Sequence, residues 1–241
     1  MFLTDIGIDI GTSKTLICEK NKGIILNEPS IIAIDKKTQK ILGIGLEALN
    51  MIGKESTNVK IIHPLENGII KDVDALELII NEFIKKVKTQ NVLLKPRIII
   101  GSPIGITELE KDILRDIFLK IGARKVKIEP SIKLAAIGVG MDISKPIANM
   151  IIDIGASKTE IAVLSLNDIV VEKSVKIGGN KFNETIIKYI REKYKVLIGE
   201  TTSENIKLNY INVNTKNTYN IEIKGKDLIT GLPTIIKINN T

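Results

Sequence analysis

The feature that most constrains this chain is a short segment that occurs twice. Residues 8–15 read IDIGTSKT and residues 152–159 read IDIGASKT, so the two copies differ only at Thr12 and Ala156. Each copy follows an apolar run and precedes a segment in which apolar residues alternate. This pattern predicts a strand, a tight turn and a second strand at each place. Two such hairpins predict two similar half-domains in an α/β fold.

Each turn carries the groups that bind an anion. Gly11 and Gly155 let backbone N–H groups come close to a ligand, and donors follow directly in the sequence. The candidate donors are Thr12, Ser13 and Lys14 in the first copy and Ala156, Ser157 and Lys158 in the second. Asp9 and Asp153 suit a hydrated Mg²⁺ ion, which keeps its water and reaches phosphate oxygens through it. The pair predicts a clamp around a nucleotide polyphosphate.

Other phosphate-binding motifs do not fit these turns. Neither copy is a Walker A loop of the form GxxxxGK[ST], and neither reads GxGxxG. Taken singly, each copy is also compatible with an ordinary turn, because Gly-Thr-Ser and Gly-Ala-Ser are common turn sequences. The repetition favours the binding interpretation.

Composition narrows the class of protein. A chain of 241 residues with 44% hydrophobic content can bury a core, and its apolar runs are shorter than the roughly 18 residues of a membrane span. No secretory leader opens the sequence, and Cys18 is the only cysteine, so we expect a cytoplasmic protein in a reducing compartment. The net charge is +7, but the lysines are dispersed and aromatic residues make up 3%. This balance favours an anionic lipid surface or a nucleotide and disfavours nucleic acid.

Local signals set out the rest of the chain. Short strands are predicted over residues 5–46, and apolar residues from Leu76 to Val87 follow a helical period after Asp72. Thr107-x-x-Glu110 predicts a capping box that opens a second helix. Residues 131–140 are predicted to connect the halves, and helices are predicted at 180–194 and 202–209. The first half is placed at 1–140 with a small subdomain near 31–75, and the second at 141–241 with a small subdomain near 181–241.

Together these segments resemble the MreB family of bacterial actin homologues over nearly the whole chain. The matching stretches lie at 5–15, 23–30, 64–70, 103–108, 135–138, 153–160, 198–204 and 225–233. The resemblance implies an actin-like (ribonuclease H-like) fold, with duplicated halves around a cleft for ATP and Mg²⁺. It also implies a cell-shape protein that forms antiparallel double filaments at the inner membrane face.

Site residues follow from the resemblance position by position. Residues 12–14 and 156–158 match the two phosphate loops, and Glu204, Asn205, Ile206 and Lys207 match the helix that lines ribose and adenine. Glu204 and Lys207 stand three positions apart, so they share a helix face and offer one acceptor and one donor. A solvated surface ion pair is the alternative reading of that pair.

Two departures from the family pattern predict slow ATP hydrolysis. The family carries Glu-Glu-Pro before the connecting helix, and alignment on residues 135–138 puts Ser131 in place of the glutamate that positions water. A shifted gap would use Glu129 instead. The family also has a threonine where this chain has Lys158, and added positive charge strengthens binding of the ground state without lowering the barrier.

Family members continue past the position of Thr241, so the second half is expected to be incomplete and to expose apolar surface. Val92, Leu93 and Leu94 form an apolar tip beside Lys95 and Arg97, at the position where some family members insert a loop into lipid. Packing of this tip on its own domain is the alternative.

Two rival functions stay open at this point. A nucleotide-dead or fragmentary interaction protein would modulate a full-length paralogue. A small-molecule kinase of the same fold would need a catalytic carboxylate, for which Asp72 is the candidate.

Overall fold

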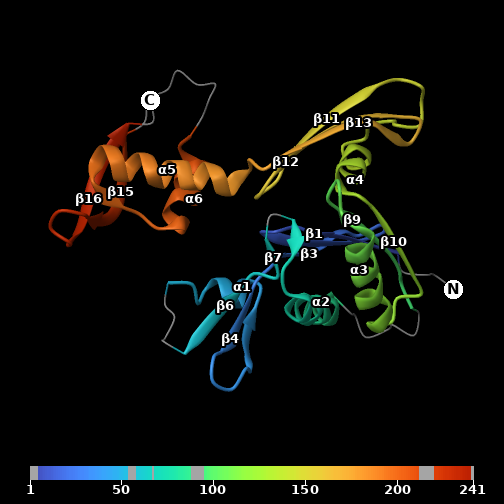
Figure 1. Cartoon of the computed structure of the whole chain (residues 1–241), viewed down its shortest axis with the longest axis horizontal. Helices are drawn as coiled ribbons and strands as arrows, with labels where there is room; N and C mark the ends of the chain where they lie inside the picture. Colours follow the sequence, from blue (N-terminus) through green and yellow to red (C-terminus); the bar gives the residue numbers. More distant parts are fainter. Residues whose placement is uncertain (1–4, 54–57, 67, 88–94, 212–219, 240–241) are drawn as a thin grey trace. The chain divides into compact units, whose positions relative to one another are not determined.

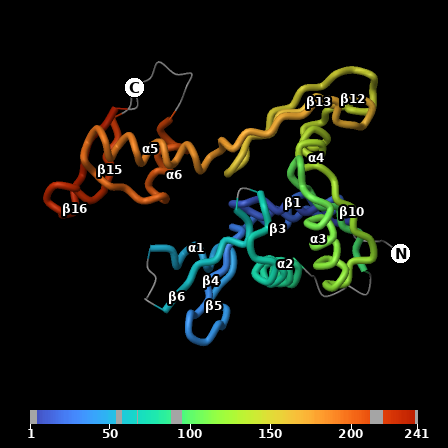
Figure 2. The backbone as a smooth tube through the Cα atoms, in the orientation of Figure 1, coloured from blue at the N-terminus to red at the C-terminus, as the bar shows by residue number. Residues whose placement is uncertain are grey.

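In the computed structural model, the described residues are 5–53, 58–66, 68–87, 95–211 and 220–239. The chain divides into two compact units, Met1–Lys176 and Ile177–Thr241. The backbone of each unit can be followed in Figure 2. The halves predicted at 1–140 and 141–241 follow the sequence repeat, whereas this division follows packing, so the boundary between the halves stays a prediction.

The first unit is built on a mixed sheet with the strand order β10-β9-β1-β2-β3 (Figure 1). β1 pairs antiparallel with β2 and parallel with β9, and β10 runs parallel to β9. Parallel neighbours need a crossover, which α2 and α3 provide. The strands are β1 (Asp5–Ile10), β2 (Lys14–Glu19), β3 (Gly23–Pro29), β9 (Arg97–Ser102) and β10 (Lys125–Pro130).

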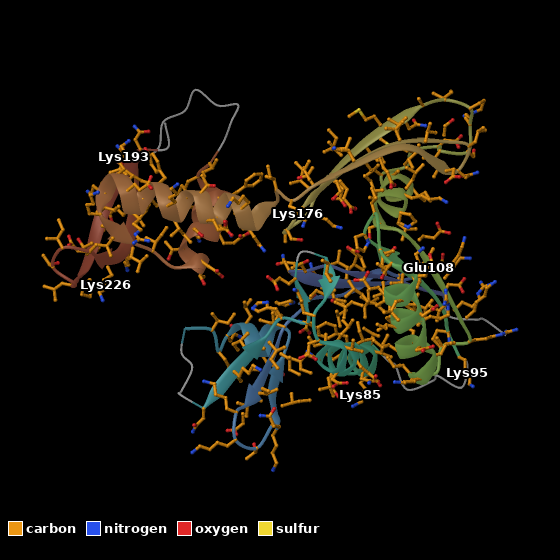
Figure 3. The ribbon with its side chains drawn as sticks, viewed as in Figure 1. Lys85, Lys95, Glu108, Lys176, Lys193 and Lys226 are labelled. Carbon is orange, nitrogen blue, oxygen red and sulfur yellow. The ribbon has the colours of Figure 1, made fainter. Side chains whose placement is uncertain are left out.

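Two amphipathic helices pack on one face of this sheet. α2 (Val73–Val87) and α3 (Glu108–Lys120) contribute Phe83 and Phe118, both fully buried, to a core that includes the apolar side chains of β1 and β9. Figure 3 shows many side chains in the space between this sheet and its helices. The helix predicted after Asp72 is confirmed, and so is the capping box, in which Thr107 Oγ1 accepts from the Glu110 N–H.

Smaller elements fill the stretch between β3 and α2. A sheet of order β5-β4-β6 carries α1 beside it, and β7 forms a short hairpin with β8. Ile32, Ala33 and Ile34 of β4 are buried, as expected for a central strand. The elements are β4 (Ile32–Asp35), β5 (Ile41–Ile44), α1 (Leu46–Leu49), β6 (Val59–Ile62), β7 (Leu65–Glu66) and β8 (Ile69–Ile70).

The repeated segment folds the same way twice. After α4 (Ser131–Gly138), the strands β11 (Asn149–Ile154), β12 (Thr159–Ser165) and β13 (Asp168–Val175) form a meander that matches β1, β2 and β3. Asp9 lies opposite Leu16 in the first copy, and Asp153 lies opposite Glu160 in the second, which is the same register. The prediction of two equivalent hairpins is therefore confirmed.

One face of the β11-β12-β13 sheet is open. Ala162 and Leu164 are buried on the face toward α4, while Met150, Ile152 and Ile154 on the other side are 54–61% exposed. This confirms the predicted exposed apolar surface for the described residues after 140.

The second unit packs helices against a separate sheet of order β14-β15-β16. Ile190 and Ile206 from the helices meet Ile221, Ile223 and Ile238 from the strands. The helices predicted at 180–194 and 202–209 are confirmed. The elements of this unit are α5 (Gly179–Tyr194), β14 (Val196–Leu197), α6 (Glu200–Asn209), β15 (Asn220–Asp227) and β16 (Pro233–Asn239). Figure 3 labels Lys193 on α5 and Lys226 on β15.

Candidate functional site

The first candidate phosphate turn is closed by its own backbone. The Gly11 N–H donates to the Lys14 carbonyl at 2.9 Å. The buried Ser30 Oγ lies 2.9 Å from Thr15 Oγ1 and donates to the Gly11 carbonyl at 2.8 Å. Hydrogen bonds to buried hydroxyls therefore hold the turn in place. A Cβ on Gly11 would lie only 2.8 Å from the Lys14 carbonyl oxygen, which explains the glycine. The Lys14 side chain is exposed.

The second turn repeats this closure and meets the first. The Gly155 N–H donates to the Lys158 carbonyl at 2.9 Å. The hydroxyl oxygens of Thr12 and Ser157, one from each hairpin, lie 3.2 Å apart. Thr12 Oγ1 also accepts from the Gly68 N–H at 3.1 Å. The two hairpins therefore bring the hydroxyls of Thr12 and Ser157 together at one place, which suits a polyphosphate ligand. Ala156 offers only its backbone there.

Three carboxylates, those of Asp9, Asp153 and Glu160, lie near these donors. The Asp9 side chain is open to solvent, yet surrounding protein makes desolvation the largest cause of its raised pKa, to which the charges of Asp153 and Glu160 add. Hydrogen bonding from Ser131 acts against this shift. Desolvation followed by the charge of Glu160 raises the pKa of Asp153. Such carboxylates attract a cation, because its charge relieves their mutual repulsion.

The residues fit a hydrated divalent cation in one respect: Asp9 and Asp153 supply two neighbouring carboxylates of the hard-oxygen type that Mg²⁺ prefers. Among the described residues, no group of three or more His, Cys, Asp or Glu side chains is arranged to hold a metal ion directly.

Ser131 lies directly against Asp9. Its hydroxyl donates to Asp9 Oδ1 at 3.2 Å, and Gly101 makes room for the pair, because a Cβ there would lie 2.7 Å from Ser131 Oγ. Glu129 stands in the same row of the sheet, since both Asp9 and Glu129 pair with Gly101. The Glu129 carboxylate contacts Lys127 at 2.6 Å and Lys133 at 3.3 Å, and the hydrogen bond from Lys127 is the main cause of its lowered pKa.

Lys158 has a partner that the sequence interpretation did not include. Its Nζ lies 2.8 Å from Glu160 Oε1, and the Glu160 side chain is only 5% exposed. Glu160 Oε1 also accepts from the Ile104 N–H at 2.9 Å. The signal was present in the sequence, because Glu160 stands at an inward position of β12 in line with Ala162 and Leu164. A carboxylate at a buried strand position calls for a partner.

The predicted nucleoside-binding residues divide between two faces of α6. Lys207 Nζ lies 2.6 Å from Glu204 Oε2 and donates to the Gly179 carbonyl at 3.2 Å, and Asn183 Nδ2 donates to Glu204 at 2.6 Å. This pair is thus anchored to the start of α5. Asn205 and Ile206 instead line a cavity of about 300 Å³ between α6 and β15. Their ligand roles, like those of Glu204 and Lys207, stay predictions.

Three further predictions concern a ligand cavity, the candidate kinase carboxylate Asp72 and the membrane loop. A larger cavity of about 460 Å³, lined by Gly7, Cys18 and Ile99, lies at the end of β1 away from Asp9 and contains none of the predicted ligand residues. Asp72 Oδ1 accepts from the Ala75 N–H at 2.9 Å at the start of α2, which is a helix-capping role. Val92, Leu93 and Leu94 lie outside the described residues. No helix in the described part of the chain is long and apolar enough to cross a membrane.

Two equivalent hairpins, one in each of two separate sheets, indicate an actin-like fold. Comparison with known proteins supports this assignment. The family described as MreB/Mbl protein matches residues 3–241, and the chain belongs to this family. It is 45% identical over 239 residues to the cell shape-determining protein Mbl of Bacillus cereus, covering 99% of this chain and 72% of that protein. It is 37% identical to the cell shape-determining protein MreB of Escherichia coli, covering 100% of this chain and 71% of that protein.

Solved structures agree with this assignment. The crystal structure of MreB5 of Spiroplasma citri bound to AMPPNP has a TM-score of 0.92 and 34% identity, covering all of this chain and 72% of the other. The MamK double helical filament has a TM-score of 0.79 at 17% identity, covering 98% and 73%, and supports the fold alone.

Asp9→Asn is expected to stabilise the ligand-free protein at neutral pH. The folded-state pKa of Asp9 is raised above 3.8, so its contribution to stability is present below 3.8 and is lost as the pH rises through the raised value. An amide removes this loss and keeps an acceptor for Ser131. The gain is below about 1 kcal/mol, because solvent screens an exposed group.

Thermal unfolding followed by circular dichroism between pH 4.5 and 7.5 measures this effect. The gap between variant and parent should widen with pH. Asp168→Asn, on an exposed β13 position, is the control and should give a flat difference. A variant less stable than the parent at pH 7.5 would contradict the assignment of a raised pKa to Asp9.

Proposed function

We propose that this chain binds ATP with Mg²⁺ between its two phosphate turns and assembles into filaments that take part in cell-shape determination at the inner membrane face. The observation that carries the proposal is the meeting of Thr12 and Ser157 hydroxyls, 3.2 Å apart, at the tips of two equivalent hairpins. Related MreB5 structures were solved with AMPPNP and with ADP. Filament assembly and cell shape come from membership of the MreB/Mbl family.

Different residues bind the phosphates, the Mg²⁺ ion and the nucleoside. Backbone N–H groups, the hydroxyls of Thr12, Ser13 and Ser157, and the ammonium of Lys14 hold the phosphates. Asp9 and Asp153 hold the hydrated Mg²⁺, which neutralises phosphate charge when bound. Glu204 and Lys207 contact the ribose and adenine, with Asn205 and Ile206 on the same helix.

Hydrolysis in this site is slow. Ser131 occupies the place of the family's water-positioning glutamate, and its hydroxyl donates to Asp9, so it supplies no base. Lys158 takes the place of a threonine and is engaged by Glu160. The cost of losing a general base is about 10²–10⁴ in rate. Glu129 is not a replacement in this proposal, because Lys127 and Lys133 hold its carboxylate.

Membrane contact is the part of the proposal that depends on residues 92–94. Burial of the Val92, Leu93 and Leu94 side chains is worth roughly 5–9 kcal/mol before ordering losses. Lys95 and Arg97 add about 1 kcal/mol each near anionic lipid. A filament sums many such loops, so assembly converts weak contact into firm attachment.

Nucleotide-dependent assembly is the direct test of the proposed function. Purified protein at rising concentration is expected to scatter more light with Mg²⁺ and ATP or AMPPNP than without nucleotide, and to pellet accordingly. Thr12→Val combined with Ser157→Ala should lose most of this response, because it removes both meeting hydroxyls. Nucleotide-independent behaviour of the parent would sink the proposal and favour the interaction protein that modulates a full-length paralogue.

Restoring the family's hydrolytic groups should raise turnover. At saturating ATP, the Ser131→Glu, Lys158→Thr double variant is expected to release phosphate about 10²-fold faster or more than the parent. A single-turnover phosphate-release assay measures the chemical step. Ser144→Glu, at an exposed loop serine, is the control and should leave the rate unchanged. A parent that already hydrolyses as fast as the double variant would refute slow turnover.

Lipid contact is tested by co-sedimentation with vesicles of phosphatidylethanolamine and phosphatidylglycerol. Leu93→Ser with Leu94→Ser should reduce the bound fraction of assembled protein several-fold, because it removes most of the apolar tip. The matched control is Leu109→Ser with Leu119→Ser, two exposed leucines of α3. Equal binding by both pairs of variants would count against the loop.

A further inference from the structure

The two lysines of the repeat stand at equivalent positions but have different surroundings. Lys14 is exposed and has no ion-pair partner among the described residues. Lys158 is 20% exposed at its side chain and lies 2.8 Å from the Glu160 carboxylate. The backbone of the two turns is the same, so the difference between the lysines comes from what surrounds each side chain, including the strand that follows the turn.

That strand differs at one position that faces the lysine. Leu16 lies opposite Asp9 in the first hairpin, and Glu160 lies opposite Asp153 in the second. Glu160 is nearly fully buried and accepts the Ile104 N–H as well as the Lys158 ammonium. A buried carboxylate left without a cation is strongly destabilising, so Glu160 holds Lys158 in place.

Lys158 is nevertheless next to the place where phosphate is proposed to bind. It follows Ser157 directly, and the Ser157 hydroxyl is the group that meets Thr12. Its side chain packs beside Gly68, where an added Cβ would lie 3.1 Å from Nζ, and the Gly68 N–H donates to Thr12. An ammonium on a flexible four-carbon stem has three donors and can change partners without moving the backbone.

We propose that Lys158 exchanges its Glu160 partner for the terminal phosphate of a bound nucleoside triphosphate, and that Glu160 thereby limits how strongly the site prefers triphosphate over diphosphate. This inference rests on the proposed nucleotide binding. A diphosphate lacks the terminal group and leaves Lys158 on Glu160. A triphosphate offers more negative charge but has to draw the lysine away from a buried carboxylate. Lys158 is thus a specificity-determining residue, and Lys14 is a constant phosphate contact.

The inference predicts opposite effects for the two members of the pair. Glu160→Gln keeps the acceptor for Ile104 but releases Lys158, so affinity for AMPPNP with Mg²⁺ should rise roughly tenfold while affinity for ADP changes less than about twofold. Lys158→Met should lower AMPPNP affinity by a similar factor. In the Lys158→Met background, Glu160→Gln should no longer tighten AMPPNP binding. Isothermal titration calorimetry with both nucleotides measures these constants.

Two further variants separate specificity from folding. Glu160→Leu reproduces the residue of the first hairpin and should act like Glu160→Gln, which keeps the test valid if one variant is unstable. Lys14→Met, at the equivalent lysine, should weaken AMPPNP and ADP binding together. Circular dichroism melts check that each variant is folded.

The outcomes are distinct. Tighter AMPPNP binding by Glu160→Gln or Glu160→Leu, lost when Lys158 is absent, supports the exchange. Folded glutamate variants that bind both nucleotides equally more weakly, or that leave the AMPPNP-to-ADP ratio unchanged, overturn the exchange but leave the proposed function intact. A parent that binds neither nucleotide overturns both.

Discussion

Two backbone hydrogen bonds, from Gly11 to Lys14 and from Gly155 to Lys158, close the two turns that carry the hydroxyls and lysines of the candidate site. Each closes a turn between strands whose register is fixed by buried partners such as Ile8 opposite Ile17. A slip of one residue would turn those side chains to solvent, so the apolar pattern also fixes where the hydroxyls stand. The donors are carried on tight turns at strand ends rather than on long loops, which is the arrangement that keeps a site preorganised.

The charges at the site oppose stability in the absence of ligand. Desolvation is the largest cause of the raised pKa of Asp9 and of Asp153, and the charge of Glu160 adds to both shifts. Among the described contacts, only Glu160 of these three carboxylates has a lysine partner. Ser131 donates a hydrogen bond to Asp9 but brings no charge. A cation bound beside these carboxylates would relieve their repulsion, and proteins commonly give up stability in this way where binding is required. The electrostatics thus favour the same ligand class as the geometry of the donors.

Local signals in the sequence were enough to predict much of the fold. The period of α2, the Thr107 capping box and both repeated hairpins depend on residues close in sequence, and all are confirmed. The Glu160 partner of Lys158 is also local, two positions away, but alternation along a strand does not show that a carboxylate at that position is buried. The Thr12 to Ser157 contact and the Ser131 to Asp9 bond join residues more than a hundred positions apart. Such pairs depend on how sheets and helices pack, which periodicity does not specify.

The repeat also explains why the two halves of one site need not act alike. Turn closure is the same in both copies, yet the residue two positions after the lysine is the partly buried Leu16 in one hairpin and the buried Glu160, which pairs with Lys158, in the other. A change from an apolar to a charged residue at that point alters no backbone bond and no register. It alters only the partner available to a flexible ammonium. Duplication therefore supplies the scaffold twice, and in the proposed exchange the second strand of each hairpin determines whether its lysine is a fixed phosphate contact or one that changes partner.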